Sequence, residues 1–327
     1  MKDIAKDLGI SPMAVSKALR NHKDISSETR ERVLRRAAEL NYRVDPVARS
    51  MVTGKSFLVG LVVPDLMQSF YAEIAAAISA TLAPAGYHVV ISNTGEDAQE
   101  EIANLELLVA RRVDGFIIAS AQRNNRVLQR LTTPYVLVDR MFTGLKANHV
   151  GANNEQIGLL ATQHLIQQGC RRIAHLRGQQ HSTGNARWSG YRQALKKHRR
   201  RIDDALVIEA GHDDRAGFEA MQRLLALKQP PDGVFCFNDP VAIGAMRAIL
   251  QAGLQVPRDI ALIGVANMHY SDMLTVPLST IDQGTAEAGR LAAERLLACM
   301  TAARKLTPQV MLIPPKLVVR ASSLRAG

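Results

Sequence analysis

The chain has 327 residues, 47% of them hydrophobic, a length that favours more than one folded module. Its formal net charge of +11 favours a polyanionic partner. Three widely separated cysteines, Cys170, Cys236 and Cys299, exclude a disulfide framework. There is neither a signal segment nor a long uninterrupted apolar run, so we expect a cytoplasmic protein that does not span a membrane.

The positive charge is concentrated at the front of the chain, where residues 1–56 hold 12 lysines and arginines against 7 acidic residues. Apolar residues recur there at helical spacing, which predicts three short amphipathic helices before residue 43. Gly9 supplies the turn between the first two helices. Ser11 is expected to cap the second helix, with Pro12 in its first position, and Ser26 is expected to cap the third.

The first two helices, "DIAKDLGISPMAVSKALR", fit either an ordinary helical hairpin or a helix-turn-helix. In a helix-turn-helix the second helix lies in the major groove of DNA, with its first residues at the base edges. Lys17 would then be a candidate for a guanine edge, and Met13 could offer apolar contact to a thymine methyl group. The residues expected to face outward are Ser11, Pro12, Met13, Ser16, Lys17 and Arg20.

Residues 44–56 have the composition of a linker. Asp45-Pro46 opens it and Gly54 closes it. Ala48 to Met51 could form one or two helical turns, which are marginal in isolation and would need a partner to become ordered.

From Phe57 onward, apolar runs rich in Val and Ile alternate with amphipathic helices, which indicates parallel strands covered on both faces. So many strands fit two doubly wound α/β lobes, with a ligand cleft between the carboxyl ends of their strands, better than one open sheet. The strands are expected at 57–64, 88–94, 114–120, 135–140, 171–178, 205–211, 233–239, 260–267 and 315–322.

Five motifs carry a resemblance to a known family: "DIAKDLGISPMAVSKALRN", "ISSETRERV", "AELNYRVDPVARSMVTGKS", "GLVVPDLMQSFYAEI" and the final "LVVRASS". With them the whole chain resembles the lactose/galactose repressor family of bacterial transcription regulators. The resemblance implies an all-α helix-turn-helix headpiece joined to a two-lobed α/β domain like that of periplasmic binding proteins. The implied divisions are a headpiece at 1–43, a hinge-helix linker at 44–56 and an effector-binding and dimerisation domain at 57–327. Within that domain, lobe 1 takes 57–155 and 284–312, and lobe 2 takes 156–283 and 313–327.

The resemblance also implies site residues. Met51 stands where the family places a leucine that wedges into the minor groove. The implied DNA-binding residues are Ser11, Pro12, Met13, Ser16, Lys17, Arg20, Ser26, Thr29, Tyr42, Ala48 and Met51. The implied effector-binding residues are Phe70, Tyr71, Asp139, His181, Thr183, Arg187, Asn238 and Asn267, with Asp239 beside them in the "FNDP" motif.

One position departs from the family pattern. Ala266 in "GVAN" stands where an aspartate usually accepts hydrogen bonds from sugar hydroxyls. Either Asn267 substitutes for it, or the ligand is not an ordinary neutral sugar. Because Arg187 and His181 remain, we hypothesise an anionic effector such as a sugar acid or sugar phosphate.

The expected function is a ligand-controlled repressor that binds a palindromic DNA operator as a homodimer, without a cofactor or metal. A partner protein could replace the small ligand. The alternative is a soluble α/β enzyme acting on a sugar phosphate, with the basic front as an appendage, although no catalytic motif supports it. The basic run at 196–201 is interpreted as a solvated helix end.

Overall fold

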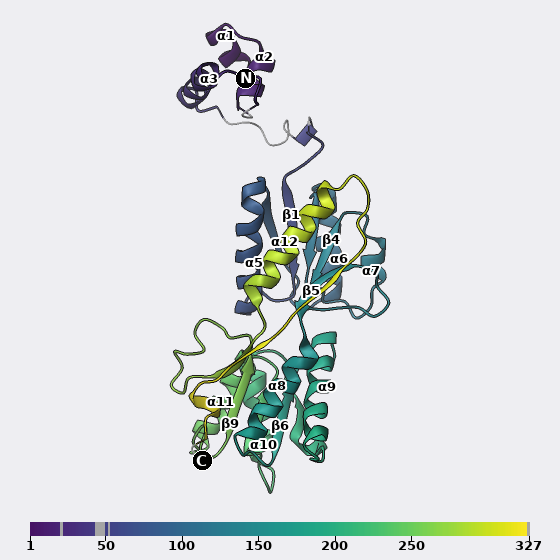
Figure 1. The fold of residues 1–327 in the computed structure, drawn as a ribbon, viewed down its shortest axis with the longest axis vertical. Coiled ribbons are helices and arrows are strands. Elements are labelled where there is room, and N and C mark those ends of the chain that lie inside the picture. Colours follow the sequence, from purple (N-terminus) through teal and green to yellow (C-terminus); the bar gives the residue numbers. More distant parts are fainter. Residues whose placement is uncertain (20–21, 43–49, 52, 326–327) are drawn as a thin grey trace. The chain divides into compact units, whose positions relative to one another are not determined.

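The structure is a computed structural model that describes residues 1–19, 22–42, 50–51 and 53–325 (Figure 1). The chain divides into two compact units, Met1–Ser56 and Phe57–Gly327, and each is described by itself.

The first unit contains the three expected helices, α1 (Lys2–Leu8), α2 (Pro12–Leu19) and α3 (Ser27–Glu39). Ser11 caps α2, because its Oγ accepts a hydrogen bond of 3.1 Å from the backbone N–H of Ala14. Ser26 caps α3 in the same way, through the N–H of Thr29 at 3.2 Å. Both predicted caps are confirmed. The small core of this unit consists of Ile4, Ala5, Val15, Ala18, Val33 and Ala37.

Gly9 ends α1 with a φ of 66°, a left-handed conformation that glycine adopts without strain. Its N–H and that of Ile10 bond back to carbonyls of α1. This turn fixes the angle at which α2 leaves α1, and Val15 and Ala18 of α2 become buried as a result. The predicted helix-turn-helix arrangement is therefore present.

The second unit holds two six-stranded sheets. The first has the order β11-β5-β4-β3-β1-β2, and all its pairs are parallel. The second has the order β12-β10-β9-β8-β6-β7, in which only the β12 pairing is antiparallel. The strands are β1 (Leu58–Val63), β2 (His88–Asn93), β3 (Gly115–Ile118), β4 (Tyr135–Val138), β5 (Asn148–Ala152), β6 (Ile173–Arg177), β7 (Val207–Glu209), β8 (Gly233–Cys236), β9 (Ala261–Val265), β10 (Ser279–Asp282), β11 (Val310–Ile313) and β12 (Lys316–Val318).

Helices cover both faces of each sheet, as the near-continuous apolar strands predict (Figure 1). The first sheet carries α5 (Ser69–Leu82), α6 (Ala98–Ala110), α7 (Arg126–Arg130) and α12 (Thr285–Thr301), and the second carries α8 (Asn154–Gln167), α9 (Ser182–Lys197), α10 (Asp214–Leu225) and α11 (Asp239–Gln251). Short 3₁₀ turns lie at Ala83–Ala85, Asp204–Leu206 and Ala321–Ser323. We call the first sheet with its helices the first lobe, and the second sheet with its helices the second lobe.

The chain crosses between the lobes three times: from β5 to α8, from β10 to α12, and from β11 to β12. All nine expected strands are present, and the predicted fold class of an all-α headpiece with a two-lobed α/β domain is confirmed. The sequence did not predict β5, β10 and β11, which are four or five residues long.

Candidate DNA-binding surface and effector cavity

Helix α2 of the headpiece presents the residues expected to meet DNA. Met13 is 65% exposed in the first turn, and Ser11 and Pro12 are exposed beside it. Ser16 and Lys17 lie one turn further along the helix and are half-buried. The start of α2 therefore presents a serine hydroxyl and an exposed apolar side chain to a ligand.

The ammonium of Lys17 has a partner that the sequence did not predict. Its Nζ donates a hydrogen bond of 3.0 Å to Oδ2 of Asp24, and Nδ1 of His22 lies 3.0 Å from the other oxygen of that carboxylate. The hydrogen bonds from Lys17 and His22 hold the pKa of the Asp24 carboxyl below its ordinary value. One carboxylate thus holds two of the headpiece's basic side chains.

The other expected DNA contacts fall into different environments. Thr29 accepts a hydrogen bond of 2.9 Å from Ser26 through its hydroxyl. The ring of Tyr42 packs against the headpiece core, half-buried. Met51 is 82% exposed in a helical turn closed by a bond from Gly54 N–H to the Ser50 carbonyl. Arg20 and Ala48 lie outside the described residues.

The second unit contains a cavity, open to solvent, between the carboxyl ends of the strands of its two lobes. Seven of the eight residues expected to bind effector line it: Phe70, Tyr71, Asp139, His181, Thr183, Arg187 and Asn238. Ala266 also lines the cavity. Ten further lining residues were not singled out from the sequence: Gln68, Ser69, Glu96, Arg140, Gln179, His212, Phe237, Pro240, Met268 and Gln283.

Arg187 on α9 is the central cation of this cavity, and only 3% of it is exposed. Nε donates to Oδ1 of Asn154 at 2.8 Å, and Nη2 donates to Oε1 of Gln283 at 2.9 Å. Nη1 donates to the carbonyl of Phe237, whose ring lies 4.6 Å from the guanidinium. All three hydrogen-bond partners are neutral. Burial consequently lowers the pKa of Arg187 to about 10, although Asp139 opposes this effect.

Asp139 faces Arg187 from the end of β4. Its Oδ2 accepts a hydrogen bond of 3.2 Å from the hydroxyl of Tyr71, whose pKa burial raises well above its ordinary value. Asp139 has a φ of 62°, and Ala266 on the opposite lobe has a φ of 129°. Residues other than glycine rarely adopt such φ angles, and backbone strain of this kind is concentrated at functional sites.

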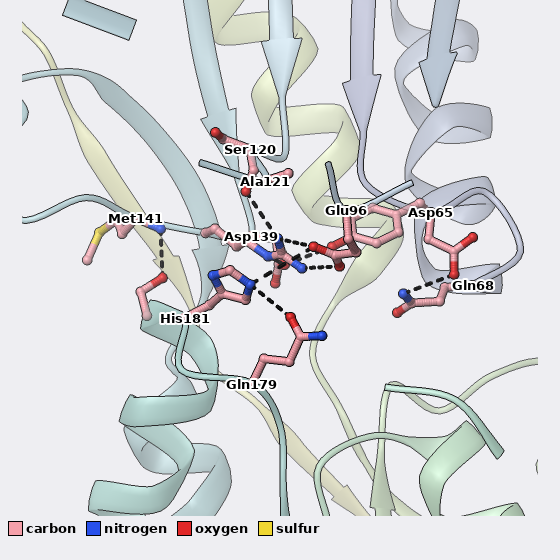
Figure 2. A network of polar contacts seen from close by, with 12 residues as sticks. Asp65, Gln68, Glu96, Ser120, Ala121, Asp139, Met141, Gln179 and His181 are labelled. Atoms are coloured by element: carbon pink, nitrogen blue, oxygen red, sulfur yellow. Dashed lines mark hydrogen bonds and ion pairs between the residues drawn. The ribbon is translucent and has the colours of Figure 1, made fainter. Parts of the chain in front are cut away.

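An arginine–glutamate pair that the sequence did not predict forms one wall of the cavity (Figure 2). Arg140 donates to both carboxylate oxygens of Glu96, with Nη1 at 2.8 Å from Oε2, and also to the Ser120 carbonyl at 3.2 Å. These bonds lower the pKa of Glu96 even though burial acts in the opposite direction. Nε2 of His181 lies 4.0 Å from Glu96 and 3.1 Å from Oε1 of Gln179.

Asn267 is the expected effector residue that does not line the cavity. Its Oδ1 accepts a hydrogen bond of 2.8 Å from Arg320, and its Nδ2 lies 3.3 Å from Asp282. Asp239 is fully buried, and it accepts hydrogen bonds from Ser271 and Thr280. Both side chains thus have partners within the second lobe.

The residues that the structure describes contain neither a candidate metal site nor a candidate membrane span. No group of three or more His, Cys, Asp or Glu side chains in that part of the chain is placed to hold a metal ion. None of the helices there is long and apolar enough to cross a membrane.

Two family models match the chain: "Bacterial regulatory proteins, lacI family" over residues 1–45, and "Periplasmic binding protein-like domain" over residues 162–323. The ribose operon repressor of Haemophilus influenzae is 34% identical over 300 residues, which are 91% of this chain and 90% of that protein. The ribose operon repressor of Escherichia coli is 33% identical over 328 residues, 99% of each chain. A crystal structure of the Lac repressor dimer bound to operator and the anti-inducer ONPF superposes with a TM-score of 0.87 at 26% identity, over 99% of this chain and 98% of that one.

The helix-turn-helix, the two-lobed domain and full-length relatives above 30% identity agree with one another. This chain belongs to the LacI family of bacterial regulatory proteins and is a ligand-responsive, DNA-binding transcriptional repressor.

Proposed function

We propose that the effector of this repressor is a small carbohydrate with one anionic group, a sugar acid or a sugar phosphate, and that it binds around Arg187. The observation that carries this proposal is a buried guanidinium whose three hydrogen-bond partners are all neutral. A guanidinium has five N–H donors, so one donor on each Nη remains for a ligand. A carboxylate or phosphate matches that pair of donors and compensates the buried charge.

The other charges of the cavity wall are one cation, Arg140, and two carboxylates, Glu96 and Asp139. Arg140 and Glu96 form a bidentate pair, and Asp139 lies 4.0 Å from Arg140 and accepts a bond from Tyr71. Unlike Arg140, Arg187 has no carboxylate among its hydrogen-bond partners, which makes it the cation that a ligand anion would complement. The carboxylates of Asp139 and Glu96 and the amide of Asn238 offer hydrogen-bond partners for sugar hydroxyls. The two ribose operon repressors among the relatives favour a pentose derivative.

Arg187 also offers a route from the effector to the lobes. Asn154 stands where the chain crosses from β5 to α8, and Gln283 where it crosses from β10 to α12. A ligand anion that draws the guanidinium toward itself changes its bonds to both crossovers. The relative position of the lobes would then respond to the effector, and a ligand shifts this equilibrium only through its different affinity for the two arrangements.

On the DNA side, we propose a homodimer that recognises a palindromic operator through two copies of α2, with Met51 entering the minor groove. The headpiece supports this with its capped, exposed helix start, and the Lac repressor, to which this chain is similar, is a dimer bound to operator in its crystal structure. The division into headpiece, hinge and effector domain at residues 43/44 and 56/57, and the lobe limits given above, belong to this proposal.

Isothermal titration of the full chain tests the effector class. The panel contains ribose, ribose 5-phosphate, ribonate and gluconate. We expect an anionic sugar to bind at least about tenfold more tightly than ribose. Replacing Arg187 by glutamine should abolish that difference, whereas the surface variant His198→Gln should keep it. Tight binding of neutral ribose alone, or an unchanged preference in Arg187→Gln, would contradict the proposal.

A further inference from the structure

Three ion pairs connect the two lobes of the effector domain, and each joins a carboxylate of the first lobe to a histidine of the second. They are Asp65–His212 at 3.8 Å, Glu73–His269 at 3.8 Å and Glu96–His181 at 4.0 Å. No other ion pair within 4.0 Å spans the lobes in the part of the chain that the structure describes. Arginines form ion pairs inside each lobe, but no arginine pair among the described residues spans the cleft.

This choice of cation has a physical consequence. A histidine attracts a carboxylate fully only when its ring is protonated, and an unperturbed histidine gains or loses that proton near pH 6.5. Lysine or arginine in the same places would attract the carboxylate at every physiological pH. We propose that Asp65–His212 and Glu73–His269 form a proton-dependent latch, which closes the lobes more firmly as the pH falls from about 8 to about 6.

The Glu73–His269 pair joins α5 of the first lobe to the loop after β9 of the second. Oε1 of Glu73 is buried and accepts no hydrogen bond from the described residues. A protonated imidazole would give this oxygen a positively charged partner. His269 is 73% exposed along its side chain and can take up a proton from solvent. Burial raises the pKa of Glu73, and the negative charges of Asp282 and Asp239 raise it further, whereas His269 lowers it.

The Asp65–His212 pair lies at the effector cavity, which His212 helps to line. Asp65 is held in place by bonds from the Met67 N–H at 2.9 Å and from Gln68 Nε2 at 3.4 Å (Figure 2). A positive charge on His212 also favours the ionised form of Glu96, the other carboxylate that faces it. Asp213 and Asp214 follow His212 in the chain and cap and begin α10, adding negative charge beside it.

The third pair is not part of the latch. Burial lowers the pKa of His181, and the positive charges of Arg140 and Arg123 lower it further, against Glu96 and Asp139. Arg140 already occupies both oxygens of Glu96. His181 is therefore less readily protonated than an unperturbed histidine, and its hydrogen-bond partner is Gln179 (Figure 2).

Closure of the lobes would take up protons at His212 and His269. Each proton taken up on closure raises the closure constant by up to about tenfold per unit fall in pH. Protons that bind more tightly to the closed form favour closure by themselves, so acid would favour the closed form even without a ligand. The latch belongs to the lobes themselves and does not depend on which effector the cavity binds.

Distances between spin labels on the two lobes test the latch in the full chain without ligand. Asn124→Cys and Asn185→Cys place labels on exposed positions on either side of the cleft, one in each lobe. We expect the population with the shorter separation to grow severalfold between pH 8 and pH 6. The double variant His212→Gln/His269→Gln should lose this response, and His198→Gln on the outer end of α9 should retain it.

A second pair of substitutions separates the latch from a general effect of losing histidines. Asp65→Asn/Glu73→Gln leaves both histidines in place but removes the charges that they face, and it should also abolish the pH response. Equal distance distributions at pH 8 and pH 6 in the wild-type chain would overturn the proposal. So would a pH response of unchanged size in either double variant.

Discussion

The ammonium of Lys17 lies 3.0 Å from the carboxylate of Asp24, seven residues further along the headpiece. Lys17 is the side chain of α2 best suited to a guanine edge, and Asp24 occupies it while His22 approaches the same carboxylate. A base or phosphate that engages Lys17 must compete with this exposed ion pair, and pairs of this kind are weak individually.

Replacing Asp24 by asparagine should strengthen operator binding. The substitution removes one negative charge from the DNA-facing surface and releases Lys17 from its strongest partner. We expect affinity for non-specific DNA to rise together with affinity for operator, because general attraction to phosphate increases. Fluorescence anisotropy with operator and scrambled duplexes measures both. Weaker binding of both duplexes would show that Asp24 positions Lys17 rather than restrains it.

Replacing Lys17 by alanine should relax base preference at one position of each half-site. A side chain that hydrogen-bonds to a guanine edge contributes about 1–3 kcal/mol of discrimination. Selection from a randomised operator library gives the preference at each position, and calorimetry gives effector affinity, which should be unchanged. If effector affinity changes as well, the headpiece is not an independent DNA-binding module.

Gly244→Ala should destabilise the second lobe. A Cβ atom at Gly244 on α11 would collide with the carbonyl of Asp214 and the backbone of Phe218 on α10, and backbone cannot move aside as a side chain can. We expect a loss of about 2–4 kcal/mol in the free energy of unfolding, measured with urea. Gln251→Ala, an exposed change on the same helix, should alter it by less than about 0.5 kcal/mol. Equal stability of the two variants would contradict the close approach of α10 and α11.

His175 should make the second lobe sensitive to acid. It is fully buried, stacks on Phe235 with ring centroids 4.4 Å apart, and has a pKa that burial lowers to about 3. The unfolded chain binds a proton at this position below about pH 6.5, whereas the folded chain does not, so stability falls as the pH falls from 6.5 toward 3.

The variant His175→Phe removes that proton-binding group and keeps an aromatic ring. Its free energy of unfolding should decline less than that of the wild type between pH 7 and pH 5, by up to about 2 kcal/mol. Urea unfolding at the two pH values measures the difference. Parallel declines in the two proteins would mean that His175 is protonated in the folded state.

The main architecture was predictable because local signals agree with the tertiary structure. Ser11-Pro12 and Ser26 marked helix starts, and the Val- and Ile-rich runs marked strands buried on both faces. The strands β5, β10 and β11 were missed because each is short, and β5 and β10 also mix polar with apolar residues. Their conformation depends on pairing with neighbouring strands, which no local pattern records.

The effector cavity was predictable in part for a similar reason. Arg187 and Asp139 were implied by the family resemblance, and both line the cavity. Glu96 and Arg140 lie in loops after different strands, 44 residues apart, and only the parallel pairing of the sheet brings them together. Asn267 follows an expected strand end, but its amide bonds to Arg320 instead of lining the cavity. Arg320 follows the last strand of the chain, and sequence spacing did not predict this contact.

Operator binding in the presence of candidate effectors tests the central claim most directly. The measurement is fluorescence anisotropy of a duplex from upstream of the chain's own gene cluster, titrated with full-length protein at about 50 and 200 mM salt. We predict binding that weakens steeply with salt and that an anionic sugar changes in the wild type but not in Arg187→Gln. Binding that ignores salt, or an effector response of the same size in Arg187→Gln, would contradict the account.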